Sequence, residues 1–116
     1  MILLTMIFLH IVDDYYLQGI LAQMKQKKFW KEQAPDAKYK YDYIWALIMH
    51  AFSWAFMVML PLTFVTAVGP LFYVVFAANV AIHAYVDHMK ANRFKINLWQ
   101  DQLAHMAQIV LTFIIL

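Results

Sequence analysis

Hydrophobic residues fill four long stretches of this chain, and polar residues gather in the connections between them. The first stretch begins at Ile2, passes Met24 and continues as an amphipathic extension to Trp30. A helix of about 20 residues can cross the hydrocarbon core of a bilayer. The pattern therefore predicts an all-α, integral membrane four-helix bundle formed by a single transmembrane domain, residues 1–116, with helices at about 2–30, 43–67, 71–90 and 98–116.

Proline and glycine mark the boundaries of these predicted helices. Pro35 breaks the polar stretch that follows the first helix, and Pro61 is expected to kink the second helix near its end. Gly69 and Pro70 form a tight turn before the third helix. The sequence shows no repeat and no second domain, so we expect the four helices to pack together as one unit.

All nine basic residues lie in two of the three connections between the predicted helices. The turn at Gly69 has none. Cytoplasmic loops of membrane proteins carry an excess of Lys and Arg, so we expect a multi-pass inner-membrane protein with both termini extracytoplasmic. The basic residues are Lys25, Lys27, Lys28, Lys31, Lys38 and Lys40 in the first connection and Lys90, Arg93 and Lys95 in the third.

The composition agrees with a membrane protein. Hydrophobic residues make up 65% of the chain and charged residues 14%, whereas soluble domains contain about 25% charged residues. The chain has no cysteine, which excludes disulfides and thiolate metal sites. Nine basic residues against seven acidic ones give no broad basic field, so the expected partner is the lipid bilayer and not a nucleic acid.

One histidine–aspartate spacing recurs three times inside the predicted helices. Residues four apart lie on one face of a helix, and ionisable residues inside a bilayer are costly enough to mark functional sites. A further histidine, His50, stands alone in the second predicted helix. The three pairs are His10 and Asp14, His83 and Asp87, and Asp101 and His105.

The order within each pair follows the direction of its helix. The aspartate follows the histidine in the first and third helices, which run toward the cytoplasm, and Asp101 precedes His105 in the fourth helix, which runs away from it. All three carboxylates are therefore expected on the cytoplasmic side of their histidines. This consistency predicts one shared metal or proton site, and unrelated buried polar contacts are the alternative.

Imidazole and carboxylate together suit zinc, and also manganese, iron or nickel. Seven such groups exceed the needs of one tetrahedral ion, so the expected cofactor is one or two divalent ions, with zinc as the first choice. The remaining groups would orient the ligands or act as acid and base. The predicted metal ligands are His10, Asp14, His50, His83, Asp87, Asp101 and His105.

Polar residues beside these pairs complete the predicted site. A carboxylate next to a metal ion can bridge two ions or act as a base, and a lysine can hold an anionic group. The predicted catalytic residues are Asp14, Asp87 and Gln102. The predicted substrate-binding residues are Gln18, Lys25 and Lys90.

Four further polar residues are assigned to structural roles. Asn79 and Gln108 are expected to join helices by hydrogen bonds. Asp13 does not share the helical face of Asp14, so we expect it at an interfacial contact. His88 lies at a helix end, where we expect it to be solvated.

The series of motifs resembles a known protein family. The motifs are His10-x3-Asp14-x3-Gln18, an isolated His50, His83-x3-Asp87-x2-Lys90 and Asp101-Gln102-x2-His105. A chain with this series resembles a family of small bacterial and phage membrane proteins classified only as a domain of unknown function. It is similar in style to inner-membrane proteins labelled as metal-dependent hydrolases. The resemblance implies a His/Asp metal site and adds little about the substrate.

The expected function is that of a membrane-embedded, metal-dependent hydrolase whose site opens to the cytoplasm. Its substrate class would be a polar or anionic small molecule or a lipid headgroup. Two alternatives stay open: a divalent-metal or proton transporter, and a structural or regulatory module such as a phage factor. The outer half of the predicted bundle carries no charge, which disfavours a conduit. Assembly as a homo-oligomer is also left open.

Overall fold

The computed structural model describes residues 1–116 and is entirely helical, so the predicted all-α class is confirmed. It contains six α-helices where the sequence predicted four. They are α1 (Ile2–Val12), α2 (Leu21–Met24), α3 (Lys27–Gln33), α4 (Asp42–Met59), α5 (Pro70–Ala91) and α6 (Leu98–Ile115). Three short segments continue or connect them: the π-helical turn η1 (Asp13–Leu17) and the 3-10 turns η2 (Ala37–Tyr39) and η3 (Leu60–Phe64).

The predicted length of the first helix is wrong, because the helix does not run unbroken from Ile2 to Trp30. Helix α1 passes into η1, and the helical path ends before Gly19. Gly19 has a φ of +55°, a left-handed conformation that glycine adopts without the steric penalty of a Cβ. The chain then resumes as the short helices α2 and α3. A single glycine inside a helical pattern is often tolerated, which is why the sequence pattern alone did not reveal this break.

The other helix boundaries have local causes. Pro61 cannot donate a backbone hydrogen bond, and it lies in η3, where the regular α4 helix has already ended. Pro70 begins α5, a position that suits its fixed φ. Helix α6 begins with a capping box, in which Asn97 accepts from the backbone N–H of Gln100 and Gln100 accepts from that of Asn97.

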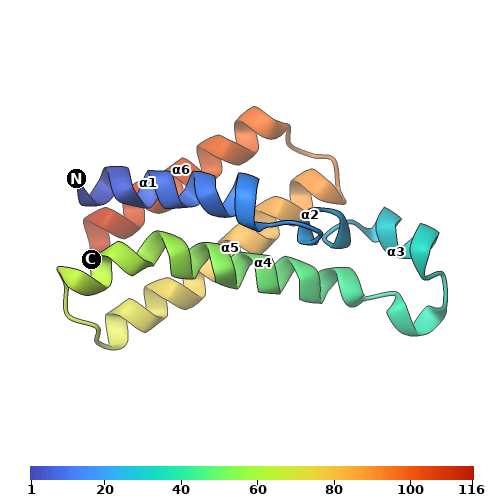
Figure 1. Cartoon of the computed structure of the whole chain (residues 1–116), viewed down its shortest axis with the longest axis horizontal. Coiled ribbons are helices and arrows are strands. Elements are labelled where there is room, and N and C mark those ends of the chain that lie inside the picture. The colour runs from blue at the N-terminus through green and yellow to red at the C-terminus, as the bar shows by residue number, and fades with distance from the viewer.

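Helices α1, α4, α5 and α6 form an elongated bundle (Figure 1), and the whole chain measures 47 × 28 × 22 Å. Helix α4 packs against both α5 and α1, and α6 packs against α5 and α1. Both termini and the connection between α4 and α5 lie at one end of the bundle. Helix α3, η2 and the connection between α5 and α6 lie toward the other end. The two segments that carry the basic residues therefore share the end opposite the termini.

Two helical segments, rather than four, are long and apolar enough to cross a membrane by length and composition. They are Ala37–Phe64 and Pro70–Ala91. Helix α1 has only 11 residues. Helix α6 has 18 residues but carries Gln100, Asp101, Gln102 and His105 in its first turns.

The interior of the bundle is divided into an apolar part and a polar part. The apolar part includes Met6, Val58, Leu62 and Ile109 and lies toward the end with the termini. Polar or charged residues make up 11 of the 24 buried residues. Charged side chains are rarely buried unless they are paired, so this share of buried polar residues is high. The helices therefore enclose a polar centre that needs its own explanation.

Candidate metal centre

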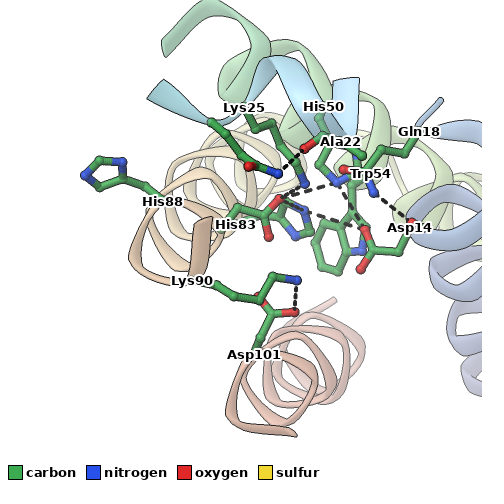
Figure 2. Close-up of polar contacts among 12 residues, drawn as sticks. Asp14, Gln18, Ala22, Lys25, His50, Trp54, His83, His88, Lys90 and Asp101 are labelled. Atoms are coloured by element: carbon green, nitrogen blue, oxygen red, sulfur yellow. Dashed lines mark hydrogen bonds and ion pairs between the residues drawn. The ribbon is translucent and has the colours of Figure 1, made fainter. Parts of the chain in front are cut away.

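Four of the predicted ligands meet at the middle of the bundle, although they come from three different helical elements. Asp14 belongs to η1, His50 to α4, and His83 and Asp87 to α5. The Nε2 atom of His50 lies 3.1 Å from Asp14 Oδ1 and 3.5 Å from Asp87 Oδ2. The Nε2 atom of His83 lies 3.6 Å from Asp87 Oδ2 and 3.9 Å from Asp14 Oδ1. Figure 2 shows Asp14, His50 and His83 gathered around one point.

These separations can be compared with the dimensions of a metal site. Ligand atoms about 2.0–2.2 Å from a tetrahedral ion lie about 3.3–3.6 Å from one another. The four distances between the imidazole and carboxylate atoms lie at or near this range. The group of Asp14, His50 and His83 could therefore hold a metal ion. Asp87 Oδ2 lies beside this group, but it is paired with the ammonium group of Lys25 at 2.7 Å.

The carboxylate of Asp87 also belongs to a second group. Its Oδ1 atom lies 3.3 Å from Nε2 of His105, and the same nitrogen lies 3.3 Å from Asp101 Oδ1. The ring of His105 stacks on that of His83, with 4.1 Å between the ring centroids. Ligand atoms of His83, Asp87 and His105 lie within 4.8 Å of one another, as do those of Asp14, His50 and His83. The centre thus offers two ligand groups, which share His83. Asp87 belongs to the second group, and its Oδ2 atom also faces the histidines of the first.

The centre is almost fully buried. The side chains of His50, His83, His105 and Asp101 are 0–1% exposed. Neither ring nitrogen of His83 has a hydrogen-bond partner, and Asp101 Oδ1 has none either. A buried polar group without a partner is costly, so a ligand for these atoms would stabilise the fold.

The charges of the centre do not balance. Its only ammonium groups are those of Lys25, 2.7 Å from Asp87 Oδ2, and Lys90, 3.0 Å from Asp101 Oδ2. With ionised carboxylates and neutral imidazoles, four negative charges and two positive ones leave two negative charges, which one divalent cation would neutralise. The four carboxylates are those of Asp13, Asp14, Asp87 and Asp101.

Hydrogen bonds around His105 determine which nitrogen can act as a ligand. The amide nitrogen of Gln108 donates to the backbone carbonyl of Asn79 at 3.2 Å and to its side-chain oxygen at 3.1 Å. The amide oxygen of Gln108 therefore faces Nδ1 of His105, at 3.1 Å, and accepts its proton. The neutral imidazole then has its lone pair on Nε2, which faces the carboxylates of Asp87 and Asp101. A lone pair pointed at carboxylates requires a cation or a proton between them.

His10 differs from the other buried histidines, because the N–H of an indole occupies the lone pair of one ring nitrogen and an amide oxygen faces the other. The indole nitrogen of Trp54 can only donate, and it donates to Nδ1 of His10 at 2.7 Å. Nε2 of His10 must then carry the proton, which it donates to Gln102 Oε1 at 3.0 Å. Gln102 in turn donates to Asp101 Oδ2 at 3.0 Å. His10 and Gln102 therefore position Asp101 and lie outside the two ligand groups.

Asp13 is part of the centre, which differs from the interfacial position expected for it. It is 1% exposed, its Oδ1 accepts a 2.6 Å hydrogen bond from Ser53, and its Oδ2 lies 3.6 Å from Nδ1 of His50. The π-helical turn η1 begins at Asp13, and single π turns are frequent at functional sites. Here the turn allows both Asp13 and Asp14 to face His50, from opposite sides of its ring.

The predicted substrate-binding residues are already engaged with other groups. Lys25 and Lys90 bind the two carboxylates described above. Gln18 donates to the backbone carbonyl of Asp14 at 2.8 Å, and its Oε1 is buried without a partner. His88 points away from the centre in Figure 2 and stacks on Tyr43, so it is half-buried where a solvated residue was expected.

Two important residues were absent from the predicted site. Trp54 lies one turn after His50 on the same face of α4, and its ring stacks 4.3 Å from that of His83. The spacing of four between His50 and Trp54 was a signal that could have identified it. Asp13 had no such signal, because only the π turn brings it inward. Asn79 does join helices as expected, by donating to Thr112 at 2.7 Å.

Comparisons with known proteins do not identify this chain. No protein-family model matches it, and no curated protein or solved structure shows significant similarity to it. The resemblance of its motifs to small phage and bacterial membrane proteins therefore stays a prediction, and its function must be argued from the centre itself.

Proposed function

We propose that this protein is a membrane-embedded, metal-dependent hydrolase. The observation that carries the proposal is the position of Asp87, whose two carboxylate oxygens face two different groups of histidine and aspartate ligands. A carboxylate between two ligand groups is the arrangement expected for a pair of metal ions about 3.5–4 Å apart. Zinc is the first choice for such a set of imidazoles and carboxylates, and manganese, iron and nickel follow.

A bound ion would lower the pKa of a coordinated water to about 7 and polarise the bond to be hydrolysed. In the first ligand group, Asp14 is the ligand nearest to solvent, with a side-chain exposure of 10%. It is therefore the better candidate for the general base, while Asp87 would bridge. Lys90 is 34% exposed and still reaches Asp101. Its ammonium group could thus meet a polar or anionic substrate at the solvent-facing edge of the centre.

The distribution of side chains supports placement in a membrane. The polar and charged residues are concentrated inside, and many large hydrophobic residues, such as Phe8, Phe56 and Tyr73, are exposed on the outside. This is the reverse of what a water-soluble surface requires. With the basic residues at one end of the bundle, we propose a multi-pass inner-membrane protein whose termini are extracytoplasmic.

A proton or metal conduit is the second candidate. It is favoured by a hydrogen-bonded line that leads from His105 through Gln108 and Asn79 to Thr112, in the direction of the termini. Two features count against it. The apolar cluster of Met6, Val58 and Ile109 fills this part of the bundle, and the ammonium group of Lys25 lies inside the centre, where it would repel a passing cation.

The test is metal content together with hydrolysis. The detergent-solubilised chain would be stripped of metal, reloaded with Zn²⁺ or Mn²⁺ and assayed with chromogenic phosphodiester and carboxylic ester substrates. We expect one or two ions per chain and turnover that His83→Ala and Asp87→Asn abolish. His88→Ala is the matched control, because His88 lies on the same helix but faces away from the centre. Equal turnover in all variants would contradict the hydrolase, and Zn²⁺ or proton flux into liposomes would favour the conduit.

A further inference from the structure

A cavity of about 390 Å³ lies outside the metal centre, between α3, the connection that contains η2, and the first turn of α4. Cavities of this size accommodate small ligands or headgroups. None of the residues that line it takes part in the His/Asp centre. The polar and aromatic lining residues used below are Lys27, Trp30, Lys31, Asp36, Lys40 and Tyr43.

The lining is positively charged. Three lysines face one carboxylate, that of Asp36, which leaves an excess of two positive charges (three minus one). Asp36 accepts a hydrogen bond from the backbone N–H of Lys38, so it is engaged within its own turn. The only ion pair in this segment joins Lys28 to Glu32, and neither of these residues lines the cavity. The three lysines that do line it have no carboxylate partner, which favours an anionic ligand.

Aromatic contacts hold the walls of the cavity in place. The indole nitrogen of Trp30 donates to the backbone carbonyl of Met24 at 2.9 Å, and its ring stacks on that of Tyr39 with 6.3 Å between centroids. The ammonium group of Lys27 lies 5.2 Å from the centre of the Tyr43 ring, a cation–π contact. The basic groups are thus presented on a structured wall.

The position of the cavity identifies the kind of anion. It lies at the end of the bundle opposite the termini (Figure 1). Near this end, at the beginning of α4, Tyr41 and Trp45 are 62% and 67% exposed, and exposed Tyr and Trp gather at the headgroup level of membranes. Lysines at that level attract anionic lipids. We propose that the cavity binds the phosphate group of an anionic phospholipid, an inference that rests on the proposed placement in a membrane and not on the proposed hydrolysis.

The experiment compares two triple variants of the full chain that lose the same charge. Lys27→Gln/Lys31→Gln/Lys40→Gln removes the lysines of the cavity, and Lys28→Gln/Lys38→Gln/Lys95→Gln removes three basic residues outside it. Calorimetry in detergent would measure binding of short-chain phosphatidylglycerol, phosphatidylcholine and inorganic phosphate. We expect saturable binding of phosphatidylglycerol that falls at least tenfold in the cavity variant and less than threefold in the control.

Three results would overturn the proposal. Equal losses in both triple variants would mean that only the overall charge matters. Equal affinity for phosphatidylcholine would remove the preference for an anion, and equal affinity for inorganic phosphate would assign the site to a soluble anion. The single variants Lys31→Glu and Lys38→Glu keep the comparison valid if a triple variant misfolds. Only Lys31→Glu should weaken phosphatidylglycerol binding.

Discussion

The indole nitrogen of Trp54 donates a 2.7 Å hydrogen bond to Nδ1 of His10, and both side chains are fully buried. This contact uses the lone pair with which His10 would otherwise bind a metal. His10 and His83 each lie four residues before an aspartate. The contact with Trp54 explains why His10 is nevertheless not placed to bind a metal ion. The sequence places a histidine on a helix face, but its neighbour on another helix decides which nitrogen is available.

The contact predicts that replacing Trp54 lowers stability without removing a metal ligand. In Trp54→Phe the aromatic ring is kept and Nδ1 of His10 loses its donor, which should cost about 1–3 kcal/mol. Thermal unfolding in detergent would measure the loss, with the exposed Trp45→Phe as the matched control. A wild-type melting temperature in Trp54→Phe would show that the contact does not contribute.

Gln108 is predicted to position His105 for metal binding. Gln108→Leu removes the acceptor that faces Nδ1 of His105, so the imidazole is no longer held with its Nε2 lone pair toward Asp87. Loss of such an orienting partner typically weakens metal binding by 10–100-fold. Competition with a chromogenic chelator would measure the Kd. Equal affinity in Gln108→Leu and the wild type would refute the role.

Lys25 is predicted to compete with a metal ion for Asp87. In Lys25→Met the buried carboxylate loses its ammonium partner, and removing one member of a buried pair costs about 3–5 kcal/mol. The metal-free variant should therefore melt at a lower temperature, and Zn²⁺ should raise its melting temperature by more than it raises that of the wild type. Lys28→Met, whose ion pair is exposed, is the control. A similar response to Zn²⁺ in Lys25→Met and the wild type would contradict this competition.

The orientation in the membrane can be tested directly, because the chain has no native cysteine. Pro35 lies at the end with the basic residues, and Gly69 lies at the end with the termini. A membrane-impermeant maleimide added to intact cells should label Gly69→Cys and should label Pro35→Cys only after lysis. The reverse pattern would overturn the proposed topology.

The parts of the structure that the sequence predicted are those set by local periodicity. The i, i+4 spacing placed His83 and Asp87 on one face of α5, and the same spacing placed Asp101 and His105 together on α6. The turn at Gly69 and Pro70 and the start of the fourth helix at about Leu98 also follow from local chemistry. These features need no knowledge of which helices are neighbours.

The parts that were missed depend on packing between helices. The break at Gly19 turns the chain so that Lys25 can reach Asp87, which an unbroken helix to Trp30 would not predict. The π turn at Asp13 brings a second carboxylate to His50. The role of Trp54 depends on its contact with His10, 44 residues away in the chain. None of these contacts can be predicted without knowing how two or more helices lie relative to one another.

The His/Asp cluster can be tested most simply by the metal content of the purified chain, measured by elemental analysis beside the His83→Ala and His88→Ala variants. We expect one or two divalent ions per chain in the wild type and in His88→Ala, and at least a tenfold weaker retention in His83→Ala, because His83 belongs to both ligand groups. A chain that binds no ion after reloading, or that binds it equally well without His83, would show that the His/Asp cluster is not a metal centre.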